Sequence, residues 1–123
     1  MHVLRNMVEA VRPGGLVLDL QVIRPNPVVE SGGRDVCEID GEPLFRKADA
    51  ATAAIDVAVA AGELVEEAVD VHDVRKHYGS GADFVDDFAG KMRKISPQDV
   101  PRLRALTEPC CLRERCRLRR LRR

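Results

Sequence analysis

The chain has 123 residues, of which 45% are apolar, so its composition fits one globular domain over residues 1–123 and argues against disorder. Aromatic residues are scarce and Trp is absent, which argues against a protein that stacks nucleic-acid bases on aromatic rings. The formal net charge is zero, but residues 113–123 hold seven Arg and one Glu, so the preceding 112 residues carry 13 basic and 19 acidic groups.

The first 23 residues predict a helix, a tight turn and a buried strand. Apolar residues recur at helical spacing over 3–11, at Val3, Leu4, Met7, Val8 and Val11. Pro13 ends this helix, and Gly14 and Gly15 permit a sharp reversal. Residues 16–23 are almost continuously apolar, which is typical of a strand covered on both faces, as in a parallel sheet.

The middle of the chain predicts a long loop and then a helix. Arg24-Pro25-Asn26-Pro27 breaks regular structure, and we expect a loop over 24–44 with a turn at Ser31-Gly32-Gly33. Within it, Val36-Cys37-Glu38-Ile39 forms either loop or a short strand. Residues 45–61 are rich in Ala and end before Gly62, which favours a helix.

The second half predicts two more strands and two short helices. Residues 64–76 alternate valines with polar residues, which favours a second strand near a sheet edge. Ser80 fits the N-cap of a helix over 81–89, and Ser96-Pro97 fits the start of another that ends near Leu106. Residues 111–119 alternate apolar residues with Arg, which favours a strand with a basic face against the acidic body. A helix is the alternative there, and we expect residues 120–123 to fray.

The resulting order of helix, strand, helix, strand, helices and strand predicts an α/β fold whose first two strands pair in parallel. This order resembles the C-terminal half of a class I S-adenosylmethionine-dependent methyltransferase. Val11, Arg12, Pro13, Gly14 and Gly15 are similar to the V-L-R/K-P-G-G turn that joins that family's fourth helix to its fifth strand. His77-Tyr78-Gly79-Ser80-Gly81 is similar to an H-Y-x-S-G pattern of uncharacterised bacterial members.

The resemblance implies a partial Rossmann-like three-layer fold, with S-adenosylmethionine as cofactor. Residues 16–23, 65–76 and 111–119 are similar to the family's fifth, sixth and seventh strands. In that family the fifth and sixth strands are parallel, and the seventh inserts between them in the antiparallel direction.

One part of the family's pattern is missing from this chain. The glycine-rich cofactor loop, D-x-G-x-G, is absent, because Gln21, Val22 and Ile23 follow the strand-like Leu16-Val17-Leu18-Asp19-Leu20. We therefore assign no cofactor-binding residue and expect a fragment that is inactive without its missing N-terminal half. Strand 16–23 would then be a bare apolar edge that pairs with that half or with a second copy in a homodimer.

Ligands of open α/β sheets bind beyond the carboxyl ends of parallel strands, which makes Gln21, Arg24, Asn26, His77 and Tyr78 the substrate-side candidates. His77 has the chemistry of a general base, and Tyr78 could donate a hydrogen bond to a substrate. The alternative, which we favour, is a His77 on the surface and a Tyr78 that packs on helix 81–89. No catalytic residue is assigned, and we expect Asp86 and Asp87 to be solvated.

The four cysteines form no C-x-x-C pair and are not spaced with the histidines as zinc ligands, so we expect free thiols and no metal. No apolar run reaches the roughly 20 residues that span a bilayer, and Arg5 and Glu9 interrupt any early apolar stretch. We therefore expect a soluble, cytoplasmic protein without a signal peptide.

The resemblance implies a methyltransferase-like protein that acts on a small molecule. Two alternatives stay open. One is a non-catalytic interaction or dimerisation module, and the other is a nucleic-acid binder that uses the Arg-rich tail. The alternation of the tail and the scarcity of aromatic residues disfavour the second alternative.

Overall fold

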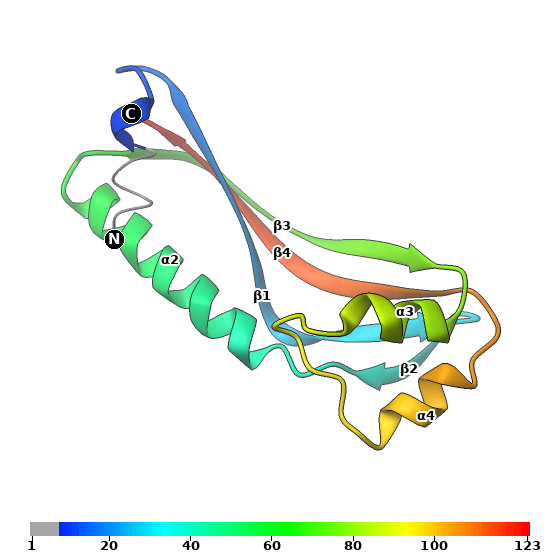
Figure 1. Cartoon of the computed structure of the whole chain (residues 1–123). Helices are drawn as coiled ribbons and strands as arrows, with labels where there is room; N and C mark the ends of the chain where they lie inside the picture. The colour runs from blue at the N-terminus through cyan, green and yellow to red at the C-terminus, as the bar shows by residue number, and fades with distance from the viewer. Residues whose placement is uncertain (1–7) are drawn as a thin grey trace.

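The computed structural model describes residues 8–123, and Figure 1 shows them as a long twisted sheet with helices packed along it. The elements are β1 (Leu16–Ser31), β2 (Arg34–Glu38), α2 (Glu42–Ala60), β3 (Val65–Tyr78), α3 (Gly81–Phe88), α4 (Asp99–Arg104) and β4 (Cys110–Arg122). The predicted helix over 45–61, strand over 64–76 and helix over 81–89 are thus confirmed to within a few residues. The helix predicted over 3–11 begins outside the described residues, and its residues 8–10 are helical.

The strand order is β2-β1-β4-β3, and every neighbouring pair is antiparallel. The predicted Rossmann-like α/β fold with a parallel pair is therefore wrong. β1 and β3 run in the same direction, but β4 separates them and forms ladder hydrogen bonds with both.

The loop predicted over 24–44 is also wrong. β1 continues through Arg24-Pro25-Asn26-Pro27 to Ser31, turns at Gly32 and Gly33 with φ of 59° and 76°, and returns as β2. The Arg24–Pro25 peptide is cis, and residues 24–27 form an irregularity of the ladder between the pairs Ile23–Arg115 and Val28–Arg113. Proline lacks an amide donor, and a bulge is a place where a strand tolerates that loss. The turn at Ser31-Gly32-Gly33 and the short strand are confirmed.

The C-terminal residues are ordered rather than frayed. β4 extends to Arg122, and the Arg123 amide donates a 3.0 Å hydrogen bond to the Gly15 carbonyl. The Gly14 amide donates a 2.8 Å bond back to the Arg123 carbonyl. The turn expected at Pro13-Gly14-Gly15 forms, with a 2.7 Å bond from the Gly15 amide to the Arg12 carbonyl, and it anchors the end of β4.

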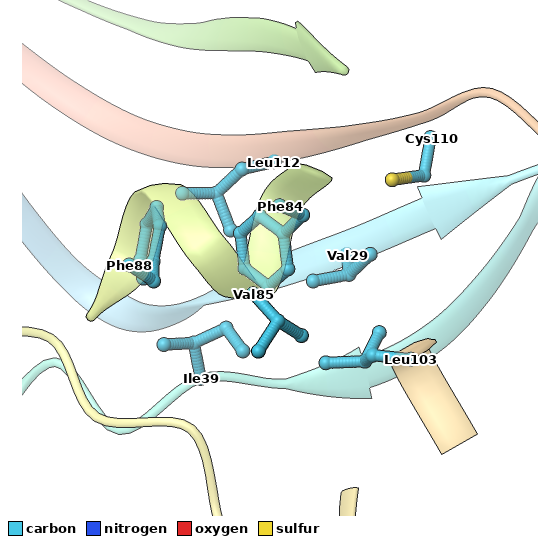
Figure 2. Close-up of a cluster of buried hydrophobic side chains, with 8 residues drawn as sticks. All are labelled: Val29, Ile39, Phe84, Val85, Phe88, Leu103, Cys110 and Leu112. Atoms are coloured by element: carbon cyan, nitrogen blue, oxygen red, sulfur yellow. The ribbon is translucent and has the colours of Figure 1, made fainter. Parts of the chain in front are cut away.

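Two hydrophobic cores lie at the two ends of the sheet. The first joins α2 to β1 and β4 and contains Val8, Val17, Ile55, Ala58, Leu64 and Leu121. The second, shown in Figure 2, joins α3 and α4 to the sheet and contains Val29, Ile39, Phe84, Val85, Phe88, Leu103, Cys110 and Leu112. Leu121 and Leu112 have opposite parity in β4, so the two cores lie on opposite faces of that strand.

This arrangement leaves part of the sheet uncovered. Val17 belongs to the core under α2, so the leucines of opposite parity in β1 lie on the other face. Leu16, Leu18 and Leu20 are 42%, 61% and 57% exposed. Within residues 8–123, no helix is both long enough and apolar enough to cross a membrane.

Candidate functional site

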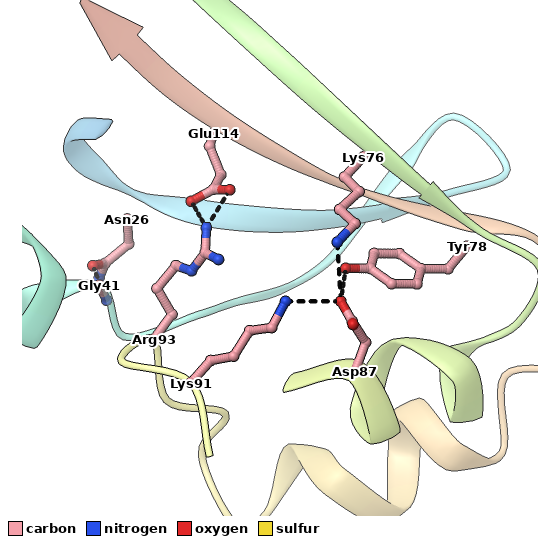
Figure 3. A network of polar contacts seen from close by, with 8 residues as sticks. All are labelled: Asn26, Gly41, Lys76, Tyr78, Asp87, Lys91, Arg93 and Glu114. Atoms are coloured by element: carbon pink, nitrogen blue, oxygen red, sulfur yellow. Dashed lines mark hydrogen bonds and ion pairs between the residues drawn. The ribbon is translucent and has the colours of Figure 1, made fainter. Parts of the chain in front are cut away.

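The richest polar cluster lies between the end of β3 and α3, as Figure 3 shows. One carboxylate oxygen, Oδ2 of Asp87, accepts hydrogen bonds from the Tyr78 hydroxyl at 2.6 Å, from Lys91 Nζ at 3.1 Å and from Lys76 Nζ at 3.2 Å. Three donors thus converge on a single oxygen. We call this set of four residues the Asp87 cluster.

Local sequence patterns bring the Asp87 cluster together. Lys76 and Tyr78 are two residues apart in β3, so both side chains lie on the same face of the sheet. The Ser80 side chain caps α3 by accepting a 3.2 Å hydrogen bond from the Asp83 amide, which fixes where the helix begins. Lys91 lies three residues past the end of α3, and the turn after the helix brings its ammonium group to Asp87.

The electrostatics of the cluster favour a protonated tyrosine beside an ionised carboxylate. The Tyr78 hydrogen bond, followed by those from Lys91 and Lys76, holds the pKa of Asp87 well below its ordinary value. Burial raises the pKa of Tyr78, and the bond to Asp87 raises it further. Tyr78 is therefore a hydrogen-bond donor in this cluster, and Asp87 is a weak base.

A second ion pair lies beside the cluster, between Arg93 of the segment after α3 and Glu114 of β4 (Figure 3). Arg93 Nη1 contacts both carboxylate oxygens of Glu114, and the two side chains are 19% and 13% exposed. The Arg93 guanidinium also lies 5.0 Å from the centre of the Phe88 ring. Glu114 lies in β4 between Arg113 and Arg115. These two arginines pair with Val28 and Ile23, the residues on either side of the irregularity in β1. The pair therefore lies next to the point where the ladder is interrupted.

Of the first three predicted site residues, Arg24 and Asn26 contact α2, whereas Gln21 bonds within β1. The Gln21 amide donates a 2.7 Å hydrogen bond to Asp19. The Arg24 guanidinium bonds to Glu42 and Asp49 of α2, and Asn26 Oδ1 accepts a 3.1 Å bond from the Gly41 amide at the start of that helix. Arg24 and Asn26 therefore anchor the N-terminus of α2.

His77 and Tyr78 are the last two residues of β3, so their side chains point to opposite faces. The Tyr78 ring packs edge-on against Phe84 with 5.2 Å between centroids, which confirms the packing on helix 81–89 that we favoured. His77 is exposed and lines an open depression of about 210 Å³ together with Glu30, Arg75, Pro109 and Cys111, among others. The structure does not bring His77 and Tyr78 together.

Sequence reasoning missed the residues that form the centre of the cluster. Asp87 was expected to be solvated, and Lys76, Lys91, Arg93 and Glu114 were not singled out. The only local signal was the spacing of four residues between Asp87 and Lys91. The contacts from Lys76 and Tyr78 depend on the packing of α3 against β3, which no sequence period encodes.

Five of the seven arginines in residues 113–123 pair with carboxylates of the acidic body. Arg119 is 7% exposed and bonds to Asp56 at 2.8 Å and to Glu66 at 2.6 Å. Arg120 and Arg122 both contact Glu67. Further pairs join Arg113 to Glu30 and Arg115 to Asp73. These guanidinium groups already have carboxylate partners within the chain.

The described residues do not form a cradle for S-adenosylmethionine. β1 continues as a strand beyond Ile23, where the family places its glycine loop, and the polar side chains near that point are paired with α2. Ser80 caps α3, as the sequence predicted, and Gly79-Ser80-Gly81 is therefore a helix start. In residues 8–123, no three His, Cys, Asp or Glu side chains are grouped so that they could hold a metal ion.

Comparison of the chain with protein-family models, with curated proteins and with solved structures finds no match.

Proposed function

We propose that the chain is the C-terminal, substrate-side portion of a class I S-adenosylmethionine-dependent methyltransferase that acts on a small molecule. The observation that carries the proposal is the order of the three long strands. β4 lies between β1 and β3 and is antiparallel to both, which is the arrangement of the last three strands in that family. The Pro13-Gly14-Gly15 turn into β1 supports the same assignment.

In this proposal, a second polypeptide segment carries the cofactor loop and lies against β1. β2 pairs with β1 only at residues 28–31, so no described strand lies on that side of residues 16–23. Leu16, Leu18 and Leu20 are exposed on the same stretch. A strand with one free edge and exposed leucines is stabilised when another chain covers it. The N-terminal half of the enzyme, or a second copy of the chain, would supply that cover.

The lack of an evident acid–base pair does not argue against methyl transfer. Transfer from a sulfonium requires chiefly that the acceptor be close and aligned, and binding groups alone can supply that.

The test is calorimetric titration of S-adenosylmethionine and its demethylated product into two proteins. One is the 123-residue chain, and the other is the chain extended by the polypeptide encoded directly upstream of Met1. We expect micromolar binding by the extended protein and none by the chain alone, because the glycine-rich loop is absent from this sequence.

A matched control replaces the glycines of the upstream D-x-G-x-G loop by valine and should abolish the binding. The proposal is overturned if no such loop is encoded upstream, or if the folded extended protein fails to bind the cofactor. Failure of the folded extended protein to bind the cofactor would favour the alternative, a non-catalytic interaction module. The alternative is also consistent with the absence of a cofactor cradle from residues 8–123.

A further inference from the structure

β3 forms one margin of the sheet and is almost wholly exposed. Its only strand partner among the described residues is β4, so one whole side of its backbone faces away from the sheet (Figure 1). Val65, Val69, Val71 and Val74 are 61%, 50%, 50% and 41% exposed. A long edge strand with exposed valines offers free amide and carbonyl groups to another strand.

The charges of β3 are self-complementary. Glu66 and Glu67 lie near its start, and Arg75 and Lys76 lie near its end. When two copies align in the antiparallel direction, the acidic end of each strand lies near the basic end of the other. These groups lie beyond residues 68–74 and also have partners within their own chain, such as Arg122 for Glu67 and Glu30 for Arg75. Their complementarity therefore favours the antiparallel orientation without forming new ion pairs. Parallel alignment would instead place like charges side by side, which costs stability.

Symmetry and charge together favour a register centred on Val71 over one centred on its neighbour Asp70. Two identical antiparallel strands are related by a two-fold axis perpendicular to the sheet, so a residue at the axis faces its own copy. An axis at Asp70 would oppose two carboxylates, whereas an axis at Val71 opposes two valines. The Val71 axis also sets Asp70 against His72 and Ala68 against Val74.

We propose that a second copy of this chain pairs with β3, edge to edge, in an antiparallel C2 dimer centred on Val71. The contact joins two four-stranded sheets into one and pairs residues 68–74 of both copies. It stops near Glu67, because β3 has a register shift between Glu66 and Ala68. The interface lies on the opposite margin of the sheet from residues 16–23, so it does not depend on the proposed enzymatic function.

The first test measures the dimer dissociation constant by sedimentation equilibrium for the native chain and for two lysine variants. Val71→Lys places two ammonium groups at the axis, and we expect the dissociation constant to rise at least tenfold. Val69→Lys places each new ammonium group opposite Asp73 of the other copy, and we expect the constant to change less than threefold or to fall.

The two variants are closely matched. Val69 and Val71 are both 50% exposed, lie on the same face of β3 and have an arginine of β4 as their partner, Arg119 and Arg117 respectively. Any general effect of a lysine on the strand is therefore shared. A native chain that is monomeric at high concentration, or equal weakening by both variants, would overturn the proposal.

A cross-linking test reports the register directly. In Val71→Cys, the two new thiols face each other with Cβ atoms about 5 Å apart, which is close enough for a disulfide after a small adjustment. In Val69→Cys, each new thiol faces Asp73 of the other copy. The two thiols are then four residues apart along the strand, which is roughly 13 Å. Under mild oxidation, the disulfide-linked dimer of Val71→Cys should form at least tenfold faster than that of Val69→Cys. The native chain, treated in the same way, measures the cross-linking by the four natural cysteines. Equal rates would contradict the register.

Discussion

The Tyr78 hydroxyl donates a 2.6 Å hydrogen bond to the Asp87 carboxylate and so ties the end of β3 to the last turn of α3. The tyrosine is one of the residues that the sequence marked as a candidate, whereas the aspartate was expected to be solvated. Their contact fixes the ionisation state of both groups, since it favours the neutral phenol and the charged carboxylate.

We expect Asp87→Asn to lower the pKa of Tyr78. Burial keeps that pKa raised in the variant, but the contribution of the carboxylate is lost, and Lys76 and Lys91 then favour the phenolate. The chain has one Tyr and no Trp, so phenolate absorbance during an alkaline titration reports this group alone. Asp86→Asn is the control, since Asp86 contacts Arg104 instead. An unchanged midpoint in Asp87→Asn would show that the hydrogen bond is absent in solution.

The same aspartate makes stability depend on acid pH. Tyr78, Lys91 and Lys76 lower the pKa of Asp87 in the folded state, so the unfolded chain binds that proton more tightly. The stability contribution is therefore present above the ordinary carboxyl pKa of about 4 and is lost as pH falls below it. We expect urea midpoints to fall less steeply in Asp87→Asn than in the native chain between roughly pH 6 and pH 3. Parallel curves for the two proteins would contradict the role of Asp87.

The sequence predicted local structure well because the relevant signals are local. The alternation of β4, the Ser80 cap and the alanine-rich α2 each follow from residues a few positions apart. The pairing of strands is a different matter. Alternation along β3 determines which face a residue lies on, but not which strand lies beside it, so nothing within 64–76 indicated that β4 would separate β3 from β1.

For the candidate site residues too, predictions that rested on neighbouring residues were correct and those that rested on the overall fold were wrong. The packing of the Tyr78 ring against α3 was predicted correctly, because the helix follows Tyr78 directly in the chain. Arg24 and Asn26 were expected beyond the end of a strand, and they lie inside a strand that continues past two prolines. The proline signal was correct about disrupted pairing, since the ladder is irregular there, but it did not end β1.

The Arg93–Glu114 pair should contribute more to stability than the exposed ion pairs. Glu114→Gln removes the charge that balances a guanidinium of which only 19% is exposed. Loss of a partner from such a largely buried pair is expected to lower the free energy of unfolding by about 2–3 kcal/mol. Asp73→Asn is the control, because it breaks the more exposed pair with Arg115 and should cost less than about 1 kcal/mol. Urea denaturation of both variants measures the difference, and equal losses would contradict the prediction.

The four cysteines should react slowly while the chain is folded. Burial raises the pKa of Cys37 to about 11 and also raises the pKa of Cys110, Cys111 and Cys116. The thiolate is the reactive form, so little of it is present near neutral pH. Titration with a chromogenic disulfide reagent should proceed at least tenfold more slowly for the native chain than for the chain in denaturing urea. A fast native phase would identify a thiol whose environment differs from the structure.

Gly81 lies where α3 begins against the end of α4, and the backbone there leaves no room for a side chain. A Cβ atom at this position would lie 1.9 Å from the Leu103 carbonyl oxygen, so Gly81→Ala must displace one helix from the other. We expect a loss of about 1–3 kcal/mol in the free energy of unfolding, as for overpacking in a tight core. Gly79→Ala is the matched control two residues earlier, because its Cβ would meet only the flexible end of Asp83 at 3.3 Å. Denaturation of both variants tests the contact, and a Gly81→Ala protein as stable as Gly79→Ala would show that α3 and α4 are not packed this closely.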